Sequence, residues 1–297
     1  MNEIERYVIE EFIEEYKLGH YGYEDLRRRL MHTNADLSIL DNLPVVSGVP
    51  KRPAMLAGAD NPWMTGSEQV EGSMITYDSG GTQVKAYLAK PKSQGPKPGI
   101  VLTHENKGLV EYVKDVANGL ASNGYVTLAP DLLTREGGTD SFANPIEEVP
   151  GALSKIPPER HVGDLKAAVD YLVSQNVGPI GAIGFCFGGG QTWRLATQDG
   201  RLAAAVPFYG PNPPLEDVPN VNAKVFAVYG GLDERINAGI DAIKSAMAQH
   251  GKTLETKVYP DSQHAFHNHT NPPDRYNPEQ AKVAWADALA WFKKYLG

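Results

Sequence analysis

The sequence has 297 residues, of which 41% are hydrophobic and 22% are charged. This composition is typical of globular proteins and excludes disordered and collagen-like chains. The length allows one large domain with an extension, or two small domains. The 36 acidic and 28 basic residues give a net charge of −8, spread without the positive stripe that a phosphate backbone requires. We therefore expect no nucleic-acid partner.

Cysteine content and hydropathy indicate the compartment. Cys186 is the only cysteine, so no intrachain disulfide can form and nothing indicates an oxidising environment. The first twenty residues carry six glutamates, and the arginines at 27–29 precede a polar segment, so no secretion signal is predicted. No segment approaches the ~20 apolar residues that span a bilayer. We expect a cytoplasmic protein without a membrane partner.

The amino-terminal segment is predicted to be helical and then irregular. Within residues 1–18, four apolar side chains recur every four residues, which predicts an amphipathic helix that must lie against another surface. A second short helix is expected over Tyr23–Met31, and the Pro- and Gly-rich stretch Asp41–Gly66 is typical of a connecting arm. We therefore divide the chain into an N-terminal extension, residues 1–65, and a main domain, residues 66–297. The extension could wrap the domain, form a homodimer contact or partly cover a cleft.

The main domain opens with a predicted hairpin and continues with alternating strands and helices. Val70–Tyr77 and Gln83–Lys90 are joined by a Gly-rich turn. The later strands are expected at Gly99–Thr103, Tyr125–Ala129, Ile180–Phe185, Leu202–Phe208, Lys224–Tyr229 and Thr253–Tyr259. The later helices are expected at Glu111–Ser122, Pro158–Ser174, Phe187–Thr197, Ile236–His250 and Pro278–Tyr295. This alternation predicts an α/β fold, with a mostly parallel sheet covered on both faces and ligands bound beyond the carboxyl ends of the strands.

The strongest local motif follows the strand Ile180–Phe185. Gly184-Phe185-Cys186-Phe187-Gly188 has the form of a nucleophile elbow with cysteine as the nucleophile. The flanking glycines suit a strained turn, and the start of the next helix favours a thiolate and leaves the Phe187 N–H free for an oxyanion. We expect the sulfur to be accessible and partly ionised. The alternatives are a cysteine that only packs in the core, or a glycine-rich turn that binds an anion.

Two later strand ends supply an acid and a base. Asp233 follows the strand Lys224–Tyr229, and His264 follows the strand Thr253–Tyr259. The chain order nucleophile, acid, histidine is that of the α/β-hydrolases. Asp261 is a rival acid that more simply shapes its turn. The string His264, His267 and His269 lacks the cysteine or carboxylate cluster typical of a metal site, so no metal or cofactor is expected.

The early strand Gly99–Thr103 is followed by His104-Glu105-Asn106-Lys107-Gly108. In α/β-hydrolases this loop provides a second oxyanion-hole N–H, for which the backbone of Asn106 is the candidate. Glu105 could lie beside Cys186, where a carboxylate opposes thiolate formation unless it takes the thiol proton itself. The simpler alternative is an ordinary surface glutamate.

Together these motifs resemble the dienelactone hydrolase family, the carboxymethylenebutenolidases of the α/β-hydrolase fold, from about Val70 to the C-terminus. The motifs that carry the resemblance are His104–Leu109, Ala129–Leu132, the elbow, Gly231–Asp233 and His264–Asn268. The resemblance implies a Cys186, Asp233 and His264 triad, with Glu105 as the accessory glutamate that pairs with the cysteine. Asn268 stands where the founding enzymes have a substrate-binding arginine, and Arg135 could match the other such arginine, or be a solvated surface residue.

These observations predict a hydrolase that cleaves small-molecule esters or lactones through a thioacyl-enzyme on Cys186. Tyr209 and Phe266, with Arg135 and Asn268, are the candidate substrate-binding residues, although aromatic residues at strand ends are more often part of the core. An alternative from another class is a ligand-binding or redox-sensing protein in which Cys186 is oxidised reversibly. Acyl transfer to an acceptor other than water is a third.

Overall fold

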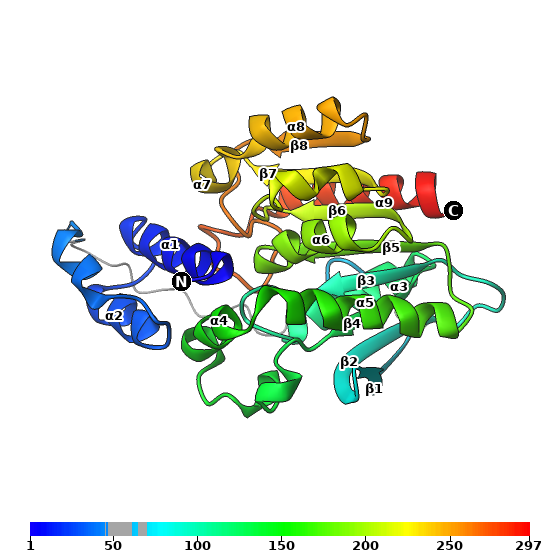
Figure 1. Ribbon diagram of the computed structural model, residues 1–297, viewed down its shortest axis with the longest axis horizontal. Helices are drawn as coiled ribbons and strands as arrows, with labels where there is room; N and C mark the ends of the chain where they lie inside the picture. The colour runs from blue at the N-terminus through cyan, green and yellow to red at the C-terminus, as the bar shows by residue number, and fades with distance from the viewer. Residues whose placement is uncertain (45, 47–60, 65–69) are drawn as a thin grey trace.

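A computed structural model describes residues 1–44, 46, 61–64 and 70–297. Most of the predicted connecting arm Asp41–Gly66 lies outside these residues. Figure 1 shows one layered α/β body, with the amino-terminal helices at one end. Among the described residues, no helix has both the length and the apolar character needed to cross a membrane.

The core is an eight-stranded sheet with the order β1-β2-β4-β3-β5-β6-β7-β8. The strands are β1 (Val70–Ser79), β2 (Thr82–Pro91), β3 (Gly99–Thr103), β4 (Val126–Pro130), β5 (Ile180–Phe185), β6 (Leu202–Phe208), β7 (Lys224–Gly230) and β8 (Leu254–Tyr259). β1 and β2 form the predicted hairpin, β2 pairs antiparallel with β4, and every other pair is parallel. The predicted α/β class and mostly parallel sheet are confirmed.

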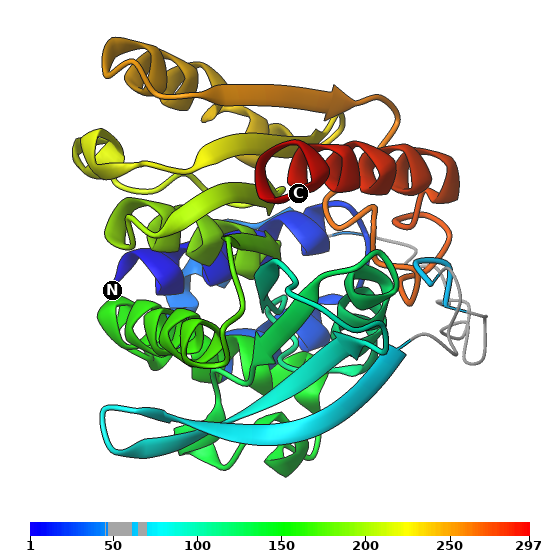
Figure 2. The same ribbon diagram turned by 90° about the vertical axis from the view of Figure 1, so that its right-hand side faces the viewer.

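Helices cover both faces of this sheet because the central strands are apolar on both sides: every residue of β3, β4 and β5 is buried. One face is packed by α3 (Glu111–Ser122) and α9 (Pro278–Leu296). The opposite face is packed by α5 (Pro158–Ser174), α6 (Phe187–Gln198) and α8 (Ile240–Gln249). Figure 2 shows the two helical layers on either side of the sheet.

Two helical segments differ from the sequence prediction. The expected helix Ile236–His250 is divided into α7 (Glu234–Asn237) and α8, because Ala238 and Gly239 separate them. A further helix, α4 (Pro145–Lys155), was not predicted. It begins with Pro145 in its first turn and contains Pro150, a residue that ordinarily argues against a helix interior.

The amino-terminal extension contains α1 (Glu3–Lys17), α2 (Tyr23–Met31) and the 3₁₀ helix η1 (Leu37–Asn42). The predicted apolar positions of α1, including Val8 and Phe12, are buried. Asn2 caps α1 and donates to the Ser154 carbonyl of α4, and Arg29 of α2 donates to the Ile146 carbonyl of α4. Figure 1 shows α1 beside the ends of α4, α6 and α7. The division of the chain at residue 65 stays a prediction.

Candidate active site

The turn between β5 and α6 places Cys186 at the sheet's carboxyl edge. Cys186 has φ 58° and ψ −121°, a left-handed conformation that costs energy for any residue with a side chain. The turn closes only because its neighbours are glycines. A Cβ atom on Gly184 would lie 2.1 Å from the Gly188 carbonyl oxygen, and one on Gly188 would lie 2.3 Å from the Thr103 carbonyl oxygen. The glycines therefore allow the strained turn.

Replacing Gly188 with alanine is expected to lower the free energy of unfolding by about 3 kcal/mol, because the new methyl group overlaps backbone atoms that cannot rotate away. Gly163 is the matched control. It is an exposed helical glycine whose added Cβ would meet nothing within 4 Å among the described residues, so Gly163→Ala should be neutral or stabilise by up to about 1 kcal/mol. Urea unfolding measures both variants. Equal stabilities would contradict the packing described for the elbow.

The structure brings His264 and Asp233 together. Nδ1 of His264 lies 2.6 Å from Oδ2 of Asp233, and both side chains are buried. Burial opposes a charge on the imidazole, but Asp233 and then Cys186 outweigh it and raise the pKa of His264 well above its ordinary value. Burial alone would raise the pKa of Asp233, but His264 outweighs it and lowers that pKa. The carboxylate thus fixes the orientation of the ring and stabilises the imidazolium that forms when Nε2 accepts a proton.

The sulfur of Cys186 lies beside this pair. A ring nitrogen of His264, the sulfur and a carboxylate oxygen of Glu11 all lie within 4.8 Å of one another. Because Nδ1 faces Asp233, the nitrogen free to approach the sulfur is Nε2, which has no hydrogen-bond partner among the described residues. The three predicted triad residues therefore meet at one point, from three strand ends.

Helix α1 covers the sulfur, which is one of the three placements that the sequence left open for the extension. The Tyr7 hydroxyl lies 3.2 Å from Sγ, and the thiol donates to both oxygens of Glu11 at 3.6 and 3.7 Å. Cys186 is only 2% exposed. The expectation of an accessible, partly ionised sulfur is therefore wrong for this state of the molecule. Burial raises the pKa of the thiol and Glu11 raises it further, while His264 opposes the shift without cancelling it.

Glu105 does not pair with the sulfur as expected. Its Oε2 accepts a hydrogen bond of 2.7 Å from Nδ2 of Asn268, and Oε1 has no partner among the described residues. The carboxylate hydrogen-bonded to Cys186 is that of Glu11, which also accepts a 2.9 Å hydrogen bond from Nδ2 of Asn106. Asn268 is fully buried and holds Glu105, a contact that replaces the predicted one with substrate.

Three other predicted substrate contacts are used by the protein itself. Arg135 donates at 2.5 Å to the buried Asp164 and at 3.1 Å to the Ser79 carbonyl, so its guanidinium is already paired with a carboxylate of the protein. Phe266 is fully buried between the rings of Tyr209 and Tyr259. Tyr209 is equally buried, with its ring 5.2 Å from that of His264. Both aromatic residues therefore support, from the core, the loop that carries His264, in place of lining a cleft.

The histidine string does not converge. His267 bonds the Tyr112 hydroxyl at 2.9 Å and stacks on Trp63, whereas His269 pairs with Asp115 at 3.2 Å. Among the described residues, the group with the spacing of a metal site is Glu11, Cys186 and His264. A metal ion there would bind the sulfur and the imidazole nitrogen that the predicted hydrolysis needs. The expectation that the protein holds no metal cofactor stays a prediction.

Sequence reasoning missed Tyr7 and Glu11. Their signal is a second stripe on the amino-terminal helix, because Glu3, Tyr7, Glu11 and Glu15 also recur every four residues. Tyr7 and Glu11 are buried together with the apolar stripe. A buried glutamate must face hydrogen-bond donors, and for Glu11 these donors are Asn106 and Cys186.

Comparisons with known proteins identify the family. The profile of the dienelactone hydrolase family matches residues 84–296. A candidate carboxymethylenebutenolidase of Methylorubrum extorquens is 35% identical, covering 71% of this chain and 77% of its own length. One from Escherichia coli O157:H7 is 32% identical, covering 78% and 90%. The crystal structure of a candidate dienelactone hydrolase from Klebsiella pneumoniae has a TM-score of 0.70 and 29% identity, covering 76% of this chain and 99% of its own. The chain belongs to the dienelactone hydrolase family and is a hydrolase.

Proposed function

We propose that this hydrolase cleaves carboxylic esters or lactones of small molecules through a thioester on Cys186. The observation that carries the proposal is the buried Asp233–His264 pair, with its 2.6 Å hydrogen bond, next to the elbow sulfur. This arrangement has the roles of a nucleophile, a base and an orienting acid. The family match and the chain order of the three residues support the same assignment.

The reaction begins with transfer of the Cys186 proton to Nε2 of His264. The sulfur then attacks the carbonyl carbon, and the carbonyl oxygen becomes an oxyanion. His264 donates its proton to the departing alkoxide, which leaves a thioester and an alcohol, or a ring-opened hydroxyl in the case of a lactone. Water attacks the thioester as His264 takes its proton, and the carboxylic acid departs as the thiol is restored. Asp233 holds the ring in the tautomer that these steps require.

The oxyanion is expected to be held by two backbone N–H groups. Phe187 is the first residue of α6, where a helix leaves its N–H groups without intrahelical partners. Asn106 lies in the loop after β3, next to the sulfur through its contact with Glu11. N–H donors aimed at a developing charge are worth several kcal/mol in such reactions, about 3 to 4 each.

The redox-sensing alternative is less well supported. Reversible oxidation usually needs a resolving cysteine, and the sequence has no second cysteine. A cysteine that is only oxidised and reduced would not need the hydrogen-bonded pair of Asp233 and His264 beside it.

Trapping of the intermediate tests the proposal. After rapid mixing with an activated aryl ester, intact-mass spectra should show one acyl adduct that hydroxylamine removes, since a thioester is labile to it. Digestion should place the adduct on Cys186, the only cysteine. A panel of lactones, aryl esters and short acyl esters then ranks the substrates. An adduct on another residue, or turnover without any adduct in a Cys186→Ala protein, would refute the thioester mechanism.

A further inference from the structure

Helix α1 occupies the space in which a substrate would have to sit. The Tyr7 hydroxyl and the Glu11 carboxylate contact the sulfur at 3.2 and 3.6 Å. An attacked carbonyl carbon must come to about 3–3.5 Å from the nucleophile. The side chains of Tyr7 and Glu11 occupy that position. Glu11 also bonds Asn106, the loop residue expected to help bind the oxyanion. The proposed nucleophile and its surroundings are occupied by the chain's own extension.

Several charged contacts join α1 to the domain beside the site, in addition to the buried apolar face of the helix. Glu3 pairs with Arg194 of α6, and Glu15 pairs with Arg275 at 2.5 Å. Glu14 accepts from Nε of Arg235 at 2.8 Å, and the Arg235 guanidinium lies 4.7 Å from the centre of the Tyr7 ring. Charged and polar contacts of this kind are typical of interfaces that open, because each charge can be solvated after separation.

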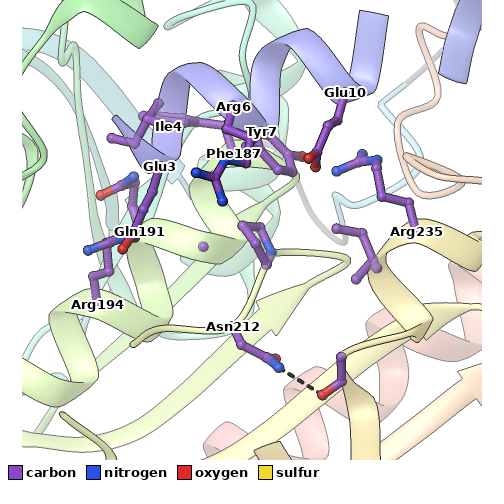
Figure 3. A pocket seen from close by; sticks show the side chains of 14 residues that line it. Glu3, Ile4, Arg6, Tyr7, Glu10, Phe187, Gln191, Arg194, Asn212 and Arg235 are labelled. Carbon is purple, nitrogen blue, oxygen red and sulfur yellow. Dashed lines mark hydrogen bonds and ion pairs between the residues drawn. The ribbon is translucent and has the colours of Figure 1, made fainter. Parts of the chain in front are cut away.

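The packing between α1 and the domain is also incomplete. A pocket of about 250 Å³ lies on one side of α1, where Tyr7 and Arg6 face Phe187 and Gln191 (Figure 3). A second cavity of about 470 Å³ is lined by Glu15 and Asn106, among others. Both pockets open to solvent, so solvent reaches the edges along which α1 meets the domain. Phe187, the neighbour of Cys186 in the chain, lines the first pocket, and Asn106 lines the second, so the two pockets flank the site that α1 covers.

The extension is separate from the family's common body. The family profile begins at residue 84, so α1 and α2 lie outside it. The two helices are bound to each other, since the Tyr21 hydroxyl donates to the Phe12 carbonyl at 2.6 Å and Arg29 lies over both rings. They can therefore move together as one element.

We propose that α1 is a displaceable cover, which holds Cys186 as a shielded neutral thiol and must leave the cleft before a substrate is attacked. In the covered state the thiol proton rests on the sulfur and points to Glu11. In the open state the sulfur faces the cleft and His264 can take that proton. This inference rests on the proposed function, because it takes Cys186 to be the nucleophile.

Alkylation of Cys186 by iodoacetamide, followed by intact mass, tests the cover without using hydrolysis. The variant Glu14→Gln/Glu15→Gln removes two ion pairs of α1 and leaves the contacts of Tyr7 and Glu11 unchanged. The native protein should react far more slowly than the urea-unfolded chain, and the double variant about tenfold faster than the native protein, the order expected for two partly buried charge pairs. The control Glu216→Gln/Glu255→Gln removes two exposed charges elsewhere and should react at the native rate.

The outcomes separate the cover from the triad. Native alkylation at the unfolded rate, or a double variant no faster than its control, would overturn the cover. If thermal melting shows the double variant to be unfolded, Glu3→Gln, which releases only the Arg194 pair, should still give a smaller acceleration, and no acceleration would also overturn the cover. Hydrolysis that survives in Cys186→Ala would refute the proposed function, while the alkylation rates would still decide whether α1 shields the sulfur.

Discussion

The Cys186→Ala variant should lose hydrolysis of activated esters and lactones by about 10⁴-fold or more, to near the uncatalysed rate. Removal of a nucleophile in this kind of constellation costs as much as removal of the whole constellation, because the steps depend on one another. The remaining rate would come from the oxyanion donors and from binding. Steady-state kinetics on the best substrate of the panel, with the variant at high concentration, measures the loss.

A structural control accompanies this measurement. Alanine removes the thiol that donates to Glu11, but Glu11 keeps its 2.9 Å hydrogen bond from Asn106, so the fold should remain. Urea unfolding should show a change of only about 1 to 2 kcal/mol, as for the loss of a small buried group. A folded variant that hydrolyses at a rate near that of the native protein would exclude Cys186 as the nucleophile.

The fold could be predicted because local patterns and chain order agree. From β3 onward, short apolar runs alternate with segments of helical periodicity. This alternation predicts a parallel sheet even where the first and last residues of each strand and helix are uncertain in the sequence. The opening hairpin followed from the Gly80-Gly81 turn. α4 was missed because its Pro150 and Gly151 argue against a helix, and packing against α1 and α2 overrides that local preference.

The meeting of the triad could be predicted for a related reason. The carboxyl ends of parallel strands lie at one edge of the sheet, so residues that follow β5, β7 and β8 are brought together by topology alone. The contacts of Tyr7 and Glu11 could not, because they join positions 179 and 175 residues apart through the docking of an extension. The partners of Arg135 and Asn268 could not be predicted either, because Asp164 and Glu105, which accept from these donors, lie far from them in the sequence.

The Asp233→Asn variant should fold normally and lose about 10⁴-fold in kcat, since an asparagine amide can donate to Nδ1 and place the ring proton on Nε2, where it cannot accept the thiol proton. Asparagine keeps the oxygen that accepts from the Ile236 N–H at the start of α7. The carboxylate of Asp233 raises the pKa of His264, so its loss should lower that pKa and move the acidic limb of the rate profile to lower pH.

Asp261→Asn separates the two acids that the sequence offers. Asp261 is exposed and has φ 52°, a conformation that asparagine tolerates well, so its variant should keep the native kcat and the native pH profile. Loss of activity in Asp261→Asn with retention in Asp233→Asn would reverse the assignment of the orienting acid. Asp233 bonds His264 at 2.6 Å. Its exchange for asparagine alters the charge of the side chain and the tautomer of the ring but little else. A large loss of kcat in Asp233→Asn, and not in Asp261→Asn, therefore comes from the histidine that Asp233 orients.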